Sequence, residues 1–400
     1  MDLKDNPKLR EILDIIKLHE KDDPAVFALK HADRNDLPVL EIAAQLAARR
    51  KAKDKLPLLY QNDELWFPPP VSLEQSSSEA TALYKASLLT GATFADLTGG
   101  FGIDCYFLSS GFNSTTYIER QDYLCEIARY NFEQLGAKIS VINETAESYL
   151  SKLTEKVDCL YLDPARRDQN KQRVFRWEDC QPNIIELLPK LLEKADSILV
   201  KAAPMLDISK AVADLLQHVK AVHIVEWQGE VKELLFLIDK HKIPNPTVYA
   251  TQIGADGKIE DRMQFTKTGH EKLSAPISLP KKYLYEPSPA LMKSGFFNSI
   301  AEKYQLTKLH PNTQLFTADE LKEGFMGKVY KVKAICNSQK KALKKLLPDG
   351  RANLKTRNFP MPVNQLKKKL SITDGGSDYL FACTLVDERK ALLVCEKVND

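Results

Sequence analysis

The stretch from about residue 94 to residue 238 limits the possible folds more than any other part of the sequence. Short apolar segments alternate there with helical patterns, which is typical of a parallel α/β sheet. The predicted strands and helices are, in chain order, 94–97, 102–110, 115–118, 122–135, 139–142, 145–153, 159–162, 180–194 and 197–200. Two last strands, 221–227 and 231–238, are separated by only three residues. A parallel crossover needs a dozen or more residues, so this pair must be an antiparallel hairpin.

The flanking segments have different patterns. Residues 1–88 are predicted to form an N-terminal helical layer, because their apolar residues recur at helical spacing. Pro244-Asn245-Pro246 marks a boundary, after which 244–282 is predicted to bridge to a second α+β region at 283–400. Helices are predicted in that region over 288–304, 337–347 and 362–369, and strands over 328–335, 353–358, 379–385 and 391–396. The expected domains are therefore 1–88, 89–243, 244–282 and 283–400, with five parallel strands and a closing hairpin in the second.

Several classes of protein are excluded by composition. No run approaches the roughly 18 apolar residues of a membrane helix, and the charged first 25 residues lack a signal peptide's apolar centre. The seven cysteines include no Cys-x-x-Cys pair, which argues against a disulfide framework or a zinc site. We therefore expect a cytoplasmic protein with no membrane contact and no metal.

A glycine-rich segment follows the first predicted strand. The run Asp96-Leu97-Thr98-Gly99-Gly100-Phe101-Gly102 does not fit Gly-x-Gly-x-x-Gly, because Cys105 occupies the third glycine position. It does fit acid-x-x-x-Gly-x-Gly, in which the acid binds a ligand's amino group and the glycines admit the ligand close to the backbone. The alternative is a tight strand-to-helix turn without a ligand.

Acids also end the next strands. Glu119 ends the second strand, where a carboxylate can accept both hydroxyls of a ribose, although an acid there can simply be solvated. Glu144 and Thr145 follow the third strand and could reach an adenine or cap the next helix. Because the carboxyl ends of parallel strands meet at one edge of the sheet, these residues are expected to face one cleft.

The fourth strand ends in Asp163-Pro164-Ala165-Arg166-Arg167. Pro164 restricts the turn and fixes Asp163 at the carboxyl edge of the sheet. Arg166 and Arg167 could contact a phosphate or form a structural ion pair. Phe175 and Trp177 in the same loop could stack on a flipped base or belong to the core.

The C-terminal part is basic. Residues 283–400 contain 20 Lys+Arg and 12 Asp+Glu, whereas residues 1–282 contain 37 and 42. Between residues 331 and 369, twelve basic residues are interrupted by one acid. A predicted helix there carries lysines on one side, namely Lys340, Lys341, Lys344 and Lys345. This pattern favours a polyanionic partner over a merely solvated lysine face.

Together these features resemble the class I S-adenosylmethionine-dependent methyltransferases, which have a Rossmann-like fold. Asp96 to Gly102 looks like their first motif, Glu119 like their ribose acid and Asp163-Pro164 like their fourth motif. The run 74–79, which includes Gln75, and the segments 285–290 and 374–379 resemble a bacterial group with a C-terminal THUMP-like domain. This resemblance implies S-adenosyl-L-methionine as cofactor and RNA, as a tRNA or rRNA base, as substrate.

The resemblance also suggests roles for individual residues. The implied catalytic residues are Asp163, Pro164 and Arg166, and the cofactor-binding residues are Gln75, Asp96, Thr98, Gly100, Gly102, Glu119, Glu144 and Thr145. Substrate contacts are expected from Arg167, Phe175, Trp177 and the four lysines at 340, 341, 344 and 345.

Two departures from related enzymes bear on the chemistry. Amino-group base methyltransferases typically carry Asp/Asn-Pro-Pro-aromatic, and here Ala165 and Arg166 follow Pro164. The fifth strand ends in Lys201-Ala202-Ala203-Pro204-Met205 without a cysteine, which disfavours covalent C5 chemistry and leaves direct displacement.

Three alternatives stay open. The chain could be a non-catalytic RNA-binding protein with a vestigial fold, or a methyltransferase that acts on protein or small molecules. A nicotinamide-dependent oxidoreductase is disfavoured by Cys105 in place of the third glycine and by the closing hairpin.

Overall fold

The computed structural model describes residues 3, 6–166, 176–337 and 340–398. The chain divides into two compact units, which we describe separately. The first contains residues 1–227, 232–246 and 252–260, and the second contains residues 228–231, 247–251 and 261–400. The finer division into four parts stays a prediction.

The N-terminal part of the first unit is helical, as the sequence predicts. Its helices are α1 (Leu9–Leu18), α2 (Pro24–Lys30), α3 (Val39–Lys55), α4 (Pro57–Tyr60), α5 (Pro70–Gln75) and α6 (Glu79–Ala86). Asp23 caps α2 by accepting hydrogen bonds from two backbone N–H groups, and Pro24 occupies the first helical position. Apolar residues of these helices share one core with Phe107 of α7 (Ile103–Ser109) and Ile127 of α8 (Asp122–Gln134).

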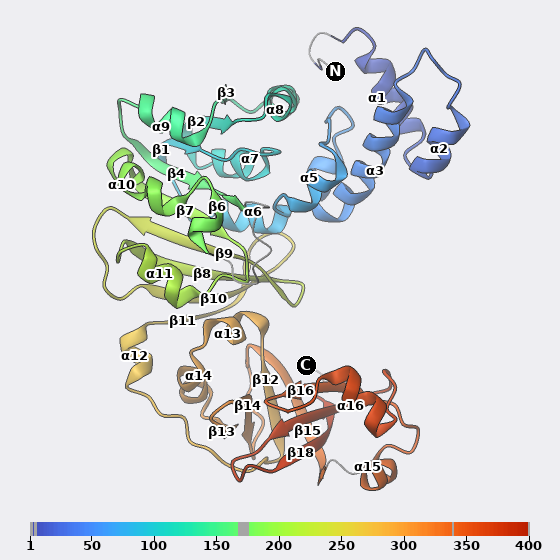
Figure 1. Ribbon diagram of the computed structural model, residues 1–400, viewed down its shortest axis with the longest axis vertical. Coiled ribbons are helices and arrows are strands. Elements are labelled where there is room, and N and C mark those ends of the chain that lie inside the picture. The colour runs from blue at the N-terminus through green and yellow to red at the C-terminus, as the bar shows by residue number, and fades with distance from the viewer. Residues whose placement is uncertain (1–2, 4–5, 167–175, 338–339, 399–400) are drawn as a thin grey trace. The chain divides into compact units, whose positions relative to one another are not determined.

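A twisted sheet forms the centre of the first unit (Figure 1). Its first seven strands along the chain are β1 (Gly91–Asp96), β2 (Phe112–Glu119), β3 (Ile139–Asn143), β4 (Val157–Leu162), β7 (Ala195–Ala202), β8 (Val219–Trp227) and β9 (Glu230–Asp239). Their spatial order is β8-β9-β7-β4-β1-β2-β3, and the order continues from β8 to β10 (Thr247–Ile253) and β11 (Ile259–Phe265). β10 and β11 lie where the chain is divided between the units.

Strand pairing confirms the predicted sheet. β3, β2, β1, β4 and β7 pair in parallel, and β9 pairs antiparallel with β7. Gln228 and Gly229 connect β8 to β9 with φ values of 54° and 75°, which suits a tight hairpin turn. Because the parallel strands run the same way, Asp96, Glu119, Asn143 and Asp163 follow or end strands at one edge.

Helices connect the strands, with one difference from prediction. They are α9 (Ala146–Lys152), α10 (Ile184–Lys194) and α11 (Ile208–Asp214), with η1 (Trp177–Asp179) before α10. The helix predicted over 180–194 begins only at Ile184. Cys180 and Gln181 form β6 (Cys180–Gln181), which pairs with β5 (Ala165–Arg166), and Asn183 then caps the helix.

The second unit is α+β, and its sheet has the order β13-β14-β12-β15-β18-β17-β16. The strands are β12 (Tyr283–Pro287), β13 (Thr307–His310), β14 (Thr313–Ala318), β15 (Gly327–Asn337), β16 (Asn353–Arg357), β17 (Asp378–Thr384) and β18 (Lys390–Lys397). The helices are α12 (Lys267–Glu271), α13 (Pro289–Ser294), α14 (Phe297–Tyr304), α15 (Lys340–Leu346) and α16 (Val363–Leu370). β12, β13 and β14 were not predicted, and the helix expected over 288–304 is two helices separated at Gly295, where φ is 76°.

This second sheet curls back on itself. Asn358, directly after edge strand β16, donates a hydrogen bond to Thr313 of β14 and contacts His310 of β13, the strand at the opposite edge. Lys355 and Arg357 of β16 both bond to Glu286 of β12. The charged groups of β16 are therefore partly enclosed by the sheet to which the strand belongs.

Candidate functional site

A cleft of about 780 Å³ lies at the carboxyl ends of the parallel strands in the first unit. Its walls come from the ends of β1, β2, β4 and β7, from the glycine-rich segment and from residues around the end of α5. This is the edge at which open α/β sheets bind ligands. Gln75 lies on this wall and is exposed, and Pro164 lies on it and is buried.

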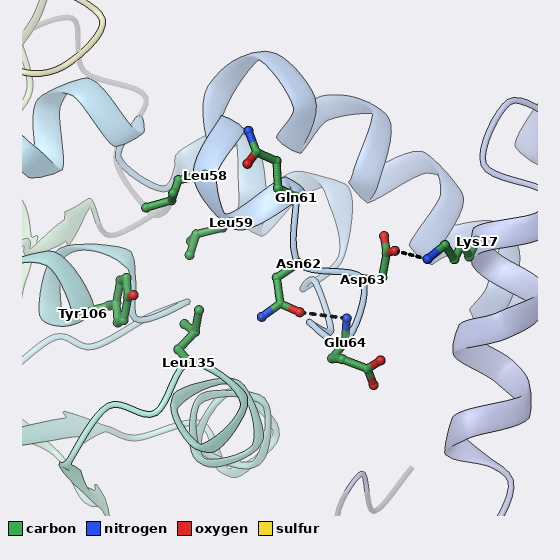
Figure 2. Close-up of a pocket in the computed structure, with 9 residues that line it drawn as sticks. All are labelled: Lys17, Leu58, Leu59, Gln61, Asn62, Asp63, Glu64, Tyr106 and Leu135. Atoms are coloured by element: carbon green, nitrogen blue, oxygen red, sulfur yellow. Dashed lines mark hydrogen bonds and ion pairs between the residues drawn. The ribbon is translucent and has the colours of Figure 1, made fainter.

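Figure 2 shows a second hollow, of about 520 Å³, beside α4 and α7. Lys17 Nζ lies 2.5 Å from Asp63 there, and Asn62 accepts a hydrogen bond from the Glu64 N–H, so these polar side chains are already paired with neighbours. It contains no strand-end carboxylate and no glycine turn. We therefore assign the candidate site to the larger cleft.

Glycines bring the backbone of the first wall close to the cleft. Gly100 has φ of 54° and Gly102, which precedes α7, has φ of 86°. A Cβ on Gly99 would lie 2.1 Å from the ring of Tyr117, and the Tyr117 hydroxyl donates a hydrogen bond to the Gly100 carbonyl. The turn is thus held in one shape that larger residues would not fit.

Asp96 supplies a buried carboxylate with an unused oxygen. Its side chain is 1% exposed, and Oδ1 accepts a hydrogen bond from the Thr98 N–H at 2.9 Å. Oδ2 has no hydrogen-bond partner among the described residues. Burial raises the pKa of Asp96 well above its usual value, and the carboxylates of Asp104, Asp163 and Glu119 add to this effect. A cationic ligand group would stabilise the ionised form.

Glu119 is held in place by the backbone. Oε2 accepts a hydrogen bond from the Gly100 N–H at 3.0 Å, and Oε1 accepts one from the Gln121 N–H at 2.9 Å. Each carboxylate oxygen can accept a second hydrogen bond. The carboxylate is therefore positioned to accept two adjacent hydroxyl donors of a ligand in the cleft.

Glu144 and Thr145 line the cleft but are also engaged on α9. Thr145 caps that helix by accepting the Ser148 N–H. Glu144 bonds to Lys152 at 2.7 Å and to Ser148 at 3.0 Å, and the hydrogen bond from Lys152 is the main cause of its lowered pKa. Helix capping is thus observed, and contact with an adenine stays a prediction.

Asp163 pairs with a lysine that sequence analysis did not select. The Asp163 N–H donates to Thr98 Oγ1 at 2.6 Å, and Asp163 Oδ2 accepts from Lys201 Nζ at 2.5 Å. Lys201 lies near the carboxyl end of β7, which pairs with β4. Its position near the end of a strand adjacent to β4 could have identified it as a site residue from the sequence. Burial lowers the pKa of Lys201, but Asp163, Asp104 and Glu233 outweigh it and raise that pKa above its usual value.

A largely buried charged cluster lies near this pair. Lys85 Nζ is 2.7 Å from Glu233, 3.2 Å from Asp104 and 3.0 Å from Ser77 Oγ. Tyr161 also donates to Asp104, at 2.7 Å. These residues come from α6, α7, β4, β9 and the segment before α6, and sequence analysis missed all of them.

Some predicted site residues cannot be placed at the site, and one is corrected. Arg166 has its backbone in β5, but its side chain, like Arg167 and Phe175, lies outside the described residues. Trp177 is fully buried, donates from Nε1 to the Ala211 carbonyl and packs edge-on against Phe236. The expectation that Trp177 stacks on a base is therefore wrong for this structure.

The predicted basic surface belongs to the second unit. The exposed lysines are Lys344 and Lys345 on α15 and Lys368 and Lys369 on α16. Lys340 and Lys341 begin α15, but their side chains lie outside the described residues. Other bases of this segment are paired: Lys333 with Asp378, Lys367 with Asp374, and Lys355 and Arg357 with Glu286. The surface is less charged than the sequence alone indicates.

The described residues contain neither a candidate metal site nor a candidate membrane-spanning helix. No group of three or more His, Cys, Asp or Glu side chains in this part of the chain is placed to hold a metal ion. No helix among the same residues is long and apolar enough to cross a membrane. All seven cysteines are free thiols.

Comparisons with known proteins give the following matches. Residues 283–325 match the model of a ferredoxin-like domain, and residues 327–397 match one described as THUMP domain-like. A crystal structure of a protein from Porphyromonas gingivalis W83, described there as a proposed methyltransferase, is 33% identical with a TM-score of 0.85. The match covers 97% of this chain and 98% of the Porphyromonas gingivalis chain.

Two partial structural matches are weaker. A Streptococcus mutans protein solved with SAH is 16% identical over 44% of this chain and all of its own, with a TM-score of 0.31. TrmK of M. capricolum, also solved with SAH, is 14% identical over 40% of this chain and 68% of its own, with a TM-score of 0.32. Among curated proteins, none matches.

Proposed function

The chain belongs to the family of class I S-adenosylmethionine-dependent methyltransferases with a C-terminal THUMP-like domain, and we propose that it methylates RNA by direct displacement. One observation carries the cofactor assignment. Asp96, whose buried carboxylate has one oxygen without a hydrogen-bond partner among the described residues, lines the cleft beside the glycine turn, and this arrangement suits a ligand with an ammonium group. S-Adenosyl-L-methionine has such a group on its methionine part.

The residues of the cleft would divide the binding of S-adenosyl-L-methionine among them. Asp96 would bind the amino group, and Glu119 would accept the ribose hydroxyls while its own orientation is fixed by Gly100 and Gln121. Thr98 orients Asp163 through its hydroxyl, and Glu144 with Thr145 would border the adenine. When bound, this cofactor supplies an electrophilic methyl group on a sulfonium.

Asp163 would act on the acceptor. Its side chain is one-third exposed at the cleft, so a carboxylate oxygen can accept a hydrogen bond from the acceptor group and take up its proton. Direct displacement needs no covalent enzyme intermediate. Cys159 and Cys180 are buried, and burial raises the pKa of the Cys159 thiol to about 11, so it is not a ready nucleophile.

Cofactor binding is tested by Asp96→Asn. We expect the affinity for S-adenosylhomocysteine, measured by titration calorimetry, to fall about 10- to 100-fold, because a charge-assisted hydrogen bond is lost. Asp33→Asn, an exposed acid in the turn after α2, is the control and should bind like the unaltered chain. Equal affinity in Asp96→Asn would contradict the assignment of Asp96.

RNA as the substrate class is supported by the THUMP domain-like match and by the exposed lysines of α15 and α16. In the quadruple variant Lys344→Gln, Lys345→Gln, Lys368→Gln and Lys369→Gln, we expect tRNA affinity to fall and its dependence on salt to weaken. The slope of log K against log salt should drop by about 3, at roughly 0.7–0.9 per lost phosphate contact.

The control for that experiment replaces four exposed lysines of the first unit, namely Lys21, Lys30, Lys53 and Lys138, by Gln. It makes the same change in net charge, so fluorescence anisotropy with a tRNA mixture should show an unchanged slope. If both quadruple variants lose the same slope, the α15 and α16 lysines are not a specific RNA-binding surface.

A further inference from the structure

The pair of Asp163 and Lys201 offers opposite hydrogen-bonding groups to the cleft. Lys201 is 13% exposed and Asp163 is 33% exposed, and both line the cleft. One carboxylate oxygen of Asp163 binds Lys201, which leaves the other oxygen as an acceptor. An ammonium has three N–H donors, so Lys201 keeps donors beyond its bond to Asp163.

The buried cluster near the pair keeps Lys201 charged. Asp104 and Glu233 face Lys201 in addition to Asp163, and Lys85 balances part of their negative charge. Burial alone would lower the pKa of Lys201, but these carboxylates raise it. A positive charge is therefore a fixed feature of this part of the wall at neutral pH.

The described lining of the cleft offers no exposed aromatic ring. Its aromatic residues are Phe101 and Tyr161, which are 9% and 1% exposed, and the Tyr161 hydroxyl is bonded to Asp104. Trp177 belongs to the core, as shown above. Enzymes that modify a base typically stack the flipped base between aromatic or apolar side chains. Among the described residues, the cleft therefore offers no exposed ring on which a flipped base could stack.

We propose that the methyl acceptor is a hydroxyl oxygen, the ribose 2′-hydroxyl of RNA, which donates to Asp163 and accepts from Lys201. This inference rests on the proposed function and replaces the base acceptor that the family resemblance implied. A hydroxyl both donates and accepts, whereas an exocyclic amino group only donates. A nitrogen acceptor gains positive charge as its bond to carbon forms, which the ammonium of Lys201 opposes, whereas an oxygen acceptor losing its proton is stabilised by it.

The acceptor oxygen forms a bond to the methyl carbon while the carbon–sulfur bond breaks, and the electron pair of that bond stays on sulfur. The hydroxyl proton passes to the Asp163 carboxylate and then to water. Lys201 keeps its proton throughout and stabilises the negative charge that develops on oxygen.

The acceptor is identified by the stability of the product to alkali. Total RNA from a strain that lacks the gene is incubated with the full chain and methyl-labelled S-adenosyl-L-methionine, and then hydrolysed in alkali. A methylated 2′-oxygen cannot attack the neighbouring phosphate, so we expect the label in alkali-resistant dinucleotides. Label in mononucleotides would overturn the hydroxyl acceptor and leave RNA methylation standing. No label in RNA, from a chain that binds S-adenosylhomocysteine, would overturn both proposals.

The role of Lys201 is tested by Lys201→Met and Lys201→Arg. We expect kcat to fall about 100-fold in Lys201→Met, with the affinity for S-adenosylhomocysteine within threefold and partial rescue in Lys201→Arg. Lys240→Met is the matched control, because Lys240, directly after β9, forms a 2.7 Å pair with Asp196 near the start of β7, the strand that carries Lys201 near its other end. Its kcat should not change. Thermal unfolding of each variant distinguishes a loss of fold from a loss of turnover.

A second measurement needs no turnover. NMR of lysines labelled with ¹⁵N at Nζ, with the Lys201 signal assigned as the one absent from Lys201→Arg, follows the charge of Lys201 with pH. The signal should stay that of an ammonium beyond pH 10. A neutral amine at pH 8 would overturn the proposal, because Lys201 could then neither donate as an ammonium nor stabilise a developing anion.

Discussion

Lys85→Met is expected to lower the free energy of unfolding by about 3–5 kcal/mol, the loss typical of removing one partner from a buried ion pair. Lys85 is fully buried, and its ammonium is bonded to both oxygens of Glu233 and to Ser77, with Asp104 at 3.2 Å. Methionine fills most of the same volume without the charge. Two carboxylates would then lie in the core without their nearest cation.

Denaturant titration measures this loss, and its pH dependence identifies the cause. In the folded chain, burial raises the pKa of Glu233 and Lys85 lowers it. Removing Lys85 therefore raises that pKa further above its value in the unfolded chain, and the folded variant binds a proton on Glu233 more tightly. Stability from such a group is present at low pH and is lost as pH rises through the folded-state pKa. The deficit of Lys85→Met should therefore shrink on acidification.

Lys152→Met is the matched control. Lys152 makes a 2.7 Å bond to Glu144, the same length as the bond from Lys85 to Glu233, but its side chain is 64% exposed. Water screens such a pair, so we expect a much smaller loss than in Lys85→Met. If Lys85→Met costs no more than Lys152→Met, the buried cluster does not stabilise the fold in the way described.

Asp163→Asn is expected to reduce kcat about 1000-fold while the affinity for S-adenosylhomocysteine changes little. Asparagine keeps the size of the side chain but cannot take up a proton, and general-base contributions are typically 10²- to 10⁴-fold. The relevant assay is transfer of labelled methyl groups to RNA from a strain that lacks the gene, together with calorimetric titration of the same samples.

Asp196→Asn provides the comparison for that experiment, since Asp196 pairs with Lys240 as Asp163 pairs with Lys201, but away from the cleft. It should retain full turnover. An Asp163→Asn protein that is folded, binds S-adenosylhomocysteine and transfers methyl groups at the original rate would show that Asp163 does not act on the acceptor.

The central sheet could be predicted because its evidence is local. Each strand is a short apolar run, and three residues between 227 and 231 allow only a hairpin. β13 escaped prediction because it has only four residues, too few for alternation to distinguish a strand. The start of α10 was missed because Cys180 and Gln181 pair with Ala165 and Arg166, a contact that no local pattern encodes.

The site was predictable to the same extent. Asp96, Glu119 and Asp163 end or follow strands, so their convergence on one cleft follows from parallel pairing. Lys85 and Glu233 are 148 residues apart, and an isolated lysine on a helix is ordinarily solvated. The free positive charge of residues 331–369 was overestimated for a related reason. Four of its bases pair with Glu286, Asp374 and Asp378, and these acids lie outside that segment in the sequence.

Glu286 has a consequence for how the C-terminal region can evolve. It lies in the segment that matches a ferredoxin-like domain, while Tyr330, Lys355 and Arg357, which bond to its carboxylate, lie in the segment that matches a THUMP-like one. The strands of the two segments also pair directly, β12 with β15. A break between residues 325 and 327 would expose an unpaired edge of β12 and of β15, so either segment could be exchanged only for one that supplies a matching strand edge.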